Sequence, residues 1–152
     1  SDIGVENSSY IYLKHEYEKQ TNGDLSGYDL ILKVAERSTG ETEYIYVHKC
    51  LISSRSTYFK DLLVSLNDVD MVDGKSLIEL KDYHLDTMNI FIRFLYTGDI
   101  IIPDTVDTEC LQELLNISKM DIDRYEIILS VCDQKRLYLD SSTAVLNQLK
   151  HD

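Results

Sequence analysis

The sequence predicts a single α+β domain in which a few short strands are surrounded by helices. Its 152 residues, 43% of them hydrophobic, are enough for a buried core without disulfides. Apolar residues alternate with the period of a strand in only a few short stretches, and elsewhere they recur at helical spacing. The single proline and five of the six glycines lie where such stretches end, and the sequence contains no proline- or serine-rich linker. The chain is therefore expected to form one continuous domain with short connections.

The first half of the chain predicts a helix, a β-hairpin and two further helices. Tyr28, Leu30, Leu32 and Val34 alternate along a strand, and the β-branched and aromatic residues of 43–47 supply its hairpin partner. The spacing then changes to that of a helix. The expected elements are a helix over 10–20, strands over 28–34 and 43–47 with a turn at 38–41, a short helix from Cys50, and a helix capped by residues 54–56 whose apolar face is Tyr58, Phe59, Leu62, Leu63 and Leu66.

The second half is mostly helical. Residues 67–74 carry three aspartates and are expected to form an acidic loop. Beyond it the expected elements are a strand over 76–80, a helix over 86–96, a brief strand over 100–102 stopped by Pro103, helices over 110–118 and 125–137, and a last helical segment capped by Ser141 and Ser142. Parallel βαβ repetition is not evident in this order.

Charge and hydropathy exclude two classes of partner. Lysine and arginine number 15 against 27 aspartates and glutamates, so the formal net charge is −12. A phosphate backbone selects a basic surface, and so does an anionic membrane, so neither nucleic acid nor membrane is an expected partner. The apolar runs are also far shorter than the roughly 18–20 residues that span a bilayer.

No constellation in the chain points to catalysis, to a metal or to a cofactor. Neither glycine-rich phosphate loops nor a G-x-S-x-G elbow occur, and His48 with Cys50 makes at most half of a tetrahedral metal site. Cys50, Cys110 and Cys132 have no disulfide or zinc spacing, so they are expected to be small core residues in a reducing compartment. We therefore expect a non-enzymatic protein of the cytoplasm, the nucleus or both.

Three motifs resemble the BTB/POZ family. They are Tyr28-Asp29-Leu30-Ile31-Leu32, the stretch from His48-Lys49 through Leu51 to Ser56 and Phe59, and Phe94-Leu95-Tyr96-Thr97-Gly98. They occur in the family's order, and the resemblance runs over residues 28–139. Residues 139–146 resemble the start of the helical box that follows BTB domains in cullin ubiquitin-ligase adaptors. The resemblance implies an N-terminal segment over 1–24, a BTB/POZ domain over 25–139 and the start of a helical region over 140–152.

The resemblance implies a protein-interaction module that self-associates, usually as a dimer. The first expected role is that of a substrate adaptor of a cullin-RING ubiquitin ligase, which binds a cullin N-terminal domain. The alternative is the dimerisation domain of a transcription regulator, which binds a corepressor peptide.

The family's functional surfaces map onto named residues of this chain. The cullin surface maps onto Tyr58, Phe59, Leu62, Leu63, Met71, Asp73 and Met120. The dimer interface maps onto Tyr10, Leu13 and Tyr17, although an apolar stripe could equally pack on its own chain. A charged corepressor pocket maps onto Asp29 and Lys49, for which a plain ion pair is the alternative.

Overall fold

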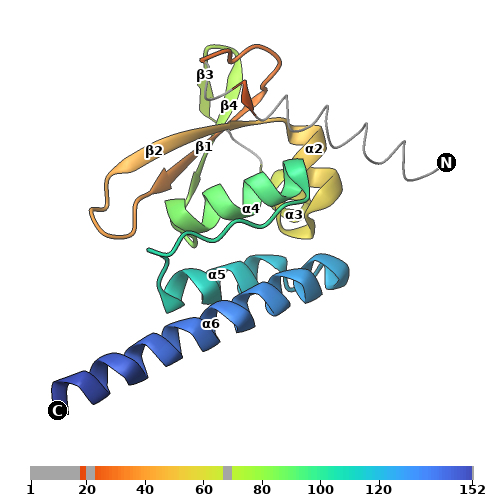
Figure 1. The fold of residues 1–152 in the computed structure, drawn as a ribbon. Coiled ribbons are helices and arrows are strands. Elements are labelled where there is room, and N and C mark those ends of the chain that lie inside the picture. Colours follow the sequence, from red (N-terminus) through yellow and green to blue (C-terminus); the bar gives the residue numbers. More distant parts are fainter. Residues whose placement is uncertain (1–17, 20–22, 67–69, 152) are drawn as a thin grey trace.

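The computed structural model describes residues 18–19, 23–66 and 70–151, without the side chains of 138, 141–146 and 151. The helices and strands follow in the order β1 (Leu30–Ala35), β2 (Thr42–Val47), α2 (Lys49–Arg55), α3 (Thr57–Ser65), β3 (Asp70–Val72), β4 (Lys75–Leu80), α4 (Leu85–Thr97), α5 (Thr108–Ser118) and α6 (Ile122–His151). Figure 1 shows α4 between the sheet and the pair formed by α5 and α6. The expected α+β class is confirmed.

The four strands form one mixed sheet in the order β2-β1-β4-β3. The predicted hairpin is present, with β1 antiparallel to β2 in a register that pairs Leu30 with Val47. In addition, β1 runs parallel to β4, a pairing that the sequence pattern does not indicate. The chain reaches this parallel position through α2 and α3, which lie at one end of the sheet in Figure 1. Such a crossover is what parallel neighbours require.

The prediction of an acidic loop over residues 67–74 is wrong for residues 70–74, which the structure describes. Asp70–Val72 forms the edge strand β3, antiparallel to β4, and a two-residue turn at Asp73 and Gly74 joins the two strands. Both turn residues have positive φ, 51° at Asp73 and 76° at Gly74. This is the pattern of a type I′ hairpin, for which Asp-Gly is a preferred sequence. Residues 67–69 lie outside the described part.

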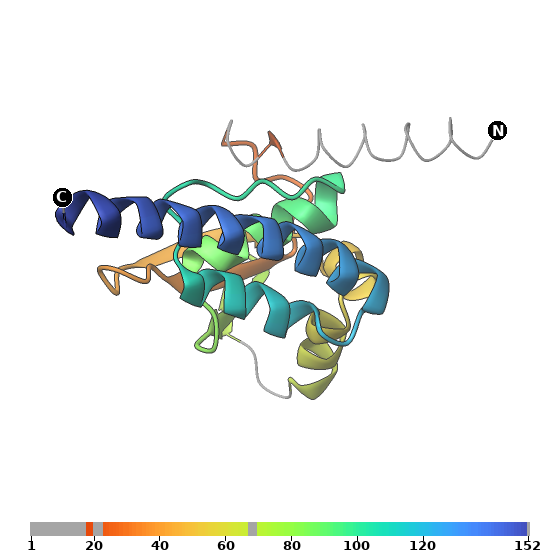
Figure 2. The same ribbon diagram turned by 60° about the horizontal axis from the view of Figure 1, so that its bottom comes forward.

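Two further expectations about secondary structure are wrong. Residues 100–102 form no strand, because no neighbouring strand among the described residues is there to pair with them. The helix expected over 125–137 and the separate segment after Ser141 are one helix, α6, which Figure 2 shows extending past α5 toward the C-terminus. No glycine or proline interrupts α6, and serines are tolerated inside a helix.

The core is built around α4. Nine of its thirteen residues are buried, whereas an ordinary surface helix buries one stripe. Phe91 of α4 stacks on Phe59 of α3 with ring centroids 6.2 Å apart. On the other side, Cys110, Leu111 and Leu114 of α5 are buried against the same cluster. Helix α4 ends at Gly98, whose φ of 77° is the left-handed geometry that glycine adopts without strain.

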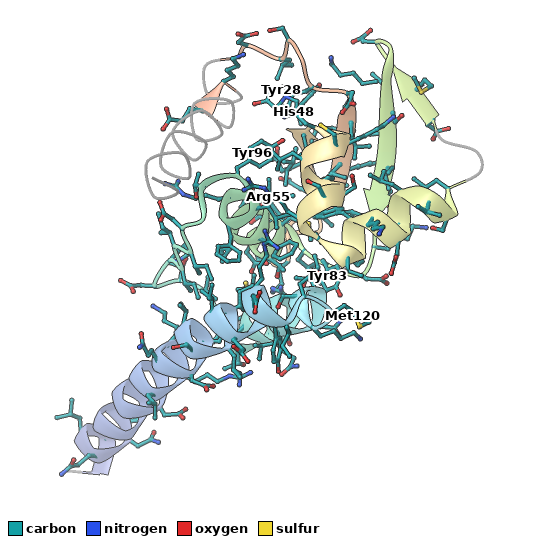
Figure 3. All side chains as sticks on the ribbon, turned by 90° about the vertical axis from the view of Figure 1, so that its right-hand side faces the viewer. Tyr28, His48, Arg55, Tyr83, Tyr96 and Met120 are labelled. Carbon is teal, nitrogen blue, oxygen red and sulfur yellow. The ribbon has the colours of Figure 1, made fainter. Side chains whose placement is uncertain are left out.

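An aromatic cluster joins α4 to the end of the sheet. The Tyr96 hydroxyl accepts a hydrogen bond from the backbone N–H of His48 at 2.9 Å and lies 2.7 Å from His48 Nδ1. The His48 ring packs against Tyr28 with centroids 4.5 Å apart, and Figure 3 shows the three side chains together. Burial raises the pKa of Tyr96, so its hydroxyl stays protonated. The cluster fixes the step from β2 into α2.

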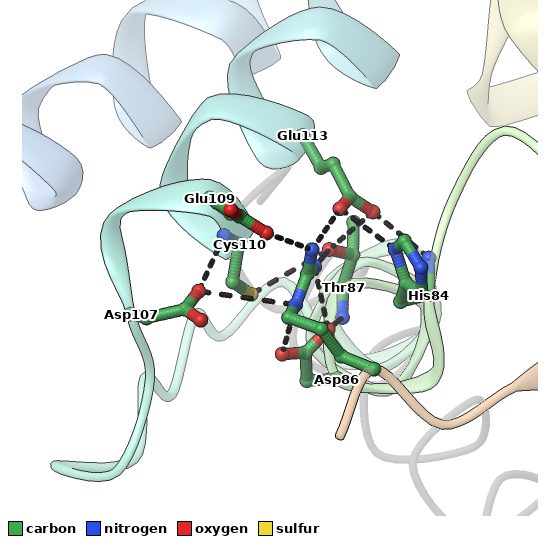
Figure 4. Close-up of polar contacts among 8 residues, drawn as sticks. His84, Asp86, Thr87, Asp107, Glu109, Cys110 and Glu113 are labelled. Carbon is green, nitrogen blue, oxygen red and sulfur yellow. Dashed lines mark hydrogen bonds and ion pairs between the residues drawn. The ribbon is translucent and has the colours of Figure 1, made fainter. Parts of the chain in front are cut away.

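Arg37 connects the β1–β2 loop to α4 and α5 through ion pairs with Asp86 and Glu113. Figure 4 shows the labelled carboxylates of this cluster, which come from α4, from α5 and from the residue just before α5. The Arg37 guanidinium makes a two-pronged contact with Asp86, at 3.0 and 3.1 Å, and pairs with Glu113. Glu109 at 3.3 Å and Asp107 at 3.8 Å complete a ring of four carboxylates. Burial, the largest single influence, disfavours ionisation of Asp86 and Glu113. Hydrogen bonds and charge attraction from Arg37, together with backbone N–H groups and His84, outweigh it and hold the pKa of both carboxyls below the ordinary range.

Removal of Arg37 should weaken the fold at neutral pH. We expect Arg37→Met to lower the free energy of unfolding by about 2 kcal/mol at pH 7, a value for a charged hydrogen bond discounted for partial exposure. The pKa values of Asp86 and Glu113 are lower in the folded protein than their ordinary values of 3.8 and 4.5. The stabilisation from the two carboxylates is therefore complete above the ordinary pKa values and is lost as the pH falls through the pKa values of the folded protein. The deficit of the variant should therefore shrink between about pH 5 and pH 3.

Urea denaturation of both proteins at pH 7, 5 and 3 measures this deficit. Arg136→Met is the control, because the polar partners of Arg136 among the described residues are Gln112 at 3.3 Å and Asp133 at 4.0 Å, both on the surface. Its effect should stay within about 0.5 kcal/mol. A deficit that is constant across this pH range would contradict the assignment of the stabilisation to the carboxylates.

The β3–β4 turn should tolerate only residues that accept positive φ. Asp73→Asn should change the free energy of unfolding by less than about 0.5 kcal/mol, whereas Asp73→Val should lower it by about 1–2 kcal/mol, because a β-branched residue is strained in the left-handed region. Both substitutions remove the charge, so they separate conformation from electrostatics. Equal urea midpoints for the two variants would show that the turn geometry carries no stability.

Candidate interaction surface

A groove of about 420 Å³ lies between α3 and the end of α5. Tyr83, from the segment between β4 and α4, is buried beneath it, and Figure 3 shows Tyr83 and Met120 near the junction of α5 and α6. The residues that line the groove are Tyr58, Asp61, Leu62 and Ser65 from α3, Tyr83, and Asn116, Ile117, Lys119 and Met120 from α5 and the turn after it. Segments more than fifty residues apart thus form its two walls.

The interior of the groove is mostly aromatic and aliphatic. Tyr58 packs edge-on against Tyr83 with centroids 5.2 Å apart, and the Tyr83 hydroxyl accepts a hydrogen bond from Asn116 Nδ2 at 2.7 Å. Burial, with smaller contributions from Tyr83 and Asp82, raises the pKa of Tyr58 to about 12, so this phenol is neutral. The charged side chains Asp61 and Lys119 are exposed. An apolar cleft with a charged rim is suited to bind a protein segment.

Met120 is the most accessible apolar side chain of the groove, with 69% of its surface exposed. It belongs to the turn between α5 and α6, opposite Tyr58 and Leu62 of α3. A methionine at a binding surface adapts its shape to a partner because its side chain is unbranched and flexible. Three of the residues predicted for partner binding, Tyr58, Leu62 and Met120, therefore come together in one groove.

Two other predicted residues of α3 lie elsewhere. Phe59 is fully buried against Phe91, so its side chain is not accessible to a partner in this conformation, and its role in binding stays a prediction. Leu63 lines a separate cavity of about 150 Å³ between α3 and β4, together with Lys49. Phe59 can support the groove only from beneath, through its edge-on contact with Tyr58.

Met71 and Asp73 lie on the β3–β4 hairpin and do not line the groove. Met71 is 61% exposed, with its sulfur 3.7 Å from the Ser76 hydroxyl, and Asp73 is exposed in the turn. The turn requires a residue that tolerates positive φ, which gives a structural reason for aspartate at position 73. Binding through these two residues stays a prediction.

Asp29 and Lys49 do not form the predicted charged pocket by pairing their side chains. Asp29 Oδ1 accepts a hydrogen bond from the backbone N–H of Lys49 at 2.8 Å, and no ion pair between the two side chains is present. Lys49 is the first residue of α2, so the carboxylate satisfies a free N–H at a helix start. The predicted dimer residues Tyr10, Leu13 and Tyr17 lie outside the described residues.

Sequence reasoning missed the polar residues that complete the groove. Tyr83 lies in a short connection without periodicity, and Asn116 is exposed on a helix that is otherwise recognised by its buried face. Asp121 was also missed, although an aspartate just before a helix is a typical helix-start signal. Its carboxylate binds the start of α3, a contact between distant segments that no local pattern encodes.

The described residues contain neither a membrane-spanning helix nor a metal-binding cluster. None of the described helices combines the length and hydropathy needed to span a membrane. No group of three or more potential metal-binding side chains occurs among the described residues. Cys110 and Cys132 are buried, which raises the pKa of their thiols to about 12 and about 11, whereas Cys50 is exposed, so its predicted core position is wrong.

Comparisons with known proteins agree with this architecture. The chain is 27% identical over 89 residues to BTB and MATH domain-containing protein 42 of Caenorhabditis elegans; the match covers 57% of this chain and 19% of that protein, so the chain spans only a small part of it. The fold is similar to the BTB domain of zebrafish PATZ1, with a TM-score of 0.56 and 20% identity, over 86% of this chain and 91% of that one. A family model for the BTB/POZ domain matches residues 17–129. The chain therefore belongs to the BTB/POZ domain family, a family of protein–protein interaction modules.

Proposed function

We propose that this domain recruits a cullin N-terminal domain and acts as substrate adaptor of a cullin-RING ubiquitin ligase. The observation that carries the proposal is the convergence of Tyr58, Leu62 and Met120 on one apolar groove. These three were assigned to cullin binding from the resemblance alone, and they come from segments that are far apart in the chain. The groove offers a partner helix an apolar cleft in which to bury its own apolar face.

The β3–β4 hairpin supplies a second contact in this proposal. Met71 and Val72 are exposed apolar side chains on an edge strand, 61% and 41% accessible. Such residues are usually covered by a partner or protected by charge. The net charge of −12 favours a partner surface with positive charge and speeds its approach.

The corepressor alternative has less support. It depends on a charged pocket formed by Asp29 and Lys49, whereas Asp29 hydrogen-bonds to a helix start and the Lys49 side chain lines a different cavity. We therefore place the cullin first, with the protein in the cytoplasm, the nucleus or both.

Charge placed in the groove should weaken cullin binding. We expect Met120→Glu to weaken the affinity for a cullin N-terminal domain at least tenfold, or about 1.4 kcal/mol, because a carboxylate would be desolvated in an apolar contact. Met120 is largely exposed, so the fold should be unaffected. Met71→Glu tests the hairpin in the same way, and both are measured by isothermal titration calorimetry.

Val64→Glu is the matched control, because Val64 belongs to α3, is 79% exposed and does not line the groove. It should change the affinity less than threefold. Absence of any complex with the unmodified protein, by calorimetry and by gel filtration, would reject the cullin proposal. Unchanged affinity of Met120→Glu would move the binding site away from the groove.

We also propose that the chain forms a homodimer through Tyr10, Leu13 and Tyr17. Multi-angle light scattering should give twice the chain mass of 17.6 kDa. The measurement is made at tens of micromolar, a concentration above common interface dissociation constants of about 1 μM. Leu13→Glu should give the monomer mass, since a charge opposes burial of the stripe. A monomer mass for the unmodified chain would be incompatible with this proposal.

A further inference from the structure

We propose that Asp121 is a positioning residue that fixes the separation of the two walls of the groove. It holds the start of α3 to the turn between α5 and α6, and so places Met120 opposite Tyr58. The consequence for cullin affinity rests on the function proposed above, whereas the effect on the geometry of the groove does not.

The contact consists of three hydrogen bonds on one carboxylate. The backbone N–H of Thr57 donates to Asp121 Oδ2 at 3.0 Å and to Oδ1 at 3.3 Å, and the Thr57 hydroxyl donates to Oδ1. Both side chains are half-buried, and 64 positions separate them in the sequence. Charge-assisted bonds of this kind are stronger and more directional than neutral ones.

Helix α3 needs this carboxylate from outside. The helix has no acidic residue in its first turn, and the hydroxyl of its cap Ser56 accepts a hydrogen bond from Phe59 N at 3.3 Å, not from Thr57 N. The N–H of Thr57, the first residue of α3, is one of the groups that a helix start leaves without an internal partner. Asp121 satisfies it and adds negative charge at the positive end of the helix dipole. The geometry is that of a helix cap supplied by a different helix.

The backbone of Asp121 shapes the turn that carries Met120. Its N–H donates to the Ser118 carbonyl at 3.0 Å, and its carbonyl accepts from Tyr125 N at 2.7 Å. One residue therefore closes the turn after α5, starts α6 and binds α3. Lys119 and Met120, which immediately precede it, line the groove. Release of the carboxylate would detach this wall of the groove from the wall on α3.

The chain contains only three methionines, which makes the geometry measurable without a partner. Met120 reports on the groove, Met71 on the β3–β4 hairpin and Met88, fully buried, on the core. Methyl-labelled methionine gives one NMR signal for each. Thr57→Val removes the hydroxyl donor at nearly constant shape, and Thr57 itself does not line the groove. Thr57→Ser retains the donor.

We expect Thr57→Val to move the Met120 signal and to weaken cullin binding about fivefold, while the Met71 and Met88 signals stay in place. Thr57→Ser should keep the Met120 signal and the cullin affinity of the unmodified protein. Asp121→Ala should weaken binding about tenfold, and the double variant should be no weaker, because the two side chains form one contact. Binding is measured at a temperature at which circular dichroism shows every variant to be folded.

Asp107→Ala is the control for a general loss of stability. Asp107 also caps a helix, through Cys110 N at 2.9 Å, but it lies at the start of α5 and does not line the groove. It should leave the Met120 signal and the affinity unchanged. An unmoved Met120 signal in Thr57→Val, or an affinity loss in Asp121→Ala no larger than in Asp107→Ala, would overturn the proposal. If the unmodified protein binds no cullin, the proposed function fails, and the Met120 signal alone supports or refutes the positioning role.

Discussion

The burial of α4 is the constraint on which the rest of the structure depends. This helix is covered by the sheet on one side and by α5 on the other, with α3 against it at Phe91. Apolar burial of this extent is the main favourable contribution to folding. Because every layer packs against α4, the layers cannot shift independently. The packing of α3 and α5 on α4 therefore helps to fix the geometry of the groove between them.

Apolar packing does not by itself set the register between layers, and two polar contacts do so here. Arg37 ties the β1–β2 loop to α4 and α5, and Asp121 ties the α5–α6 turn to α3. Both contacts join segments that are distant in the sequence, and both satisfy groups that would otherwise lose hydrogen bonds with water. Directional bonds therefore fix positions that nondirectional apolar contacts leave adjustable.

The failed expectations have identifiable causes. Residues 100–102 were predicted to form a strand because isoleucines favour extended structure, but a strand forms only where a neighbouring strand pairs with it. Residues 70–74 were predicted to form a loop because of their aspartates, although Asp73-Gly74 between Val72 and Lys75 is a hairpin signal that could have been recognised. Phe59 was assigned to the cullin-binding residues from its place in a motif, whereas in the structure it is buried against Phe91.

The sequence by itself determined the fold class, the β1–β2 hairpin, the helix beginning after Ser56 and the membership of an interaction family. Each of these follows from local periodicity, capping residues or a short motif, which are properties of neighbouring residues. Only the tertiary structure decided that β4 pairs parallel to β1, that Asp29 binds the start of α2, and that Tyr58, Leu62 and Met120 share one groove. Periodicity defines which face of a helix or strand is apolar. Which other helix or strand packs against that face depends on shape and charge across the whole chain.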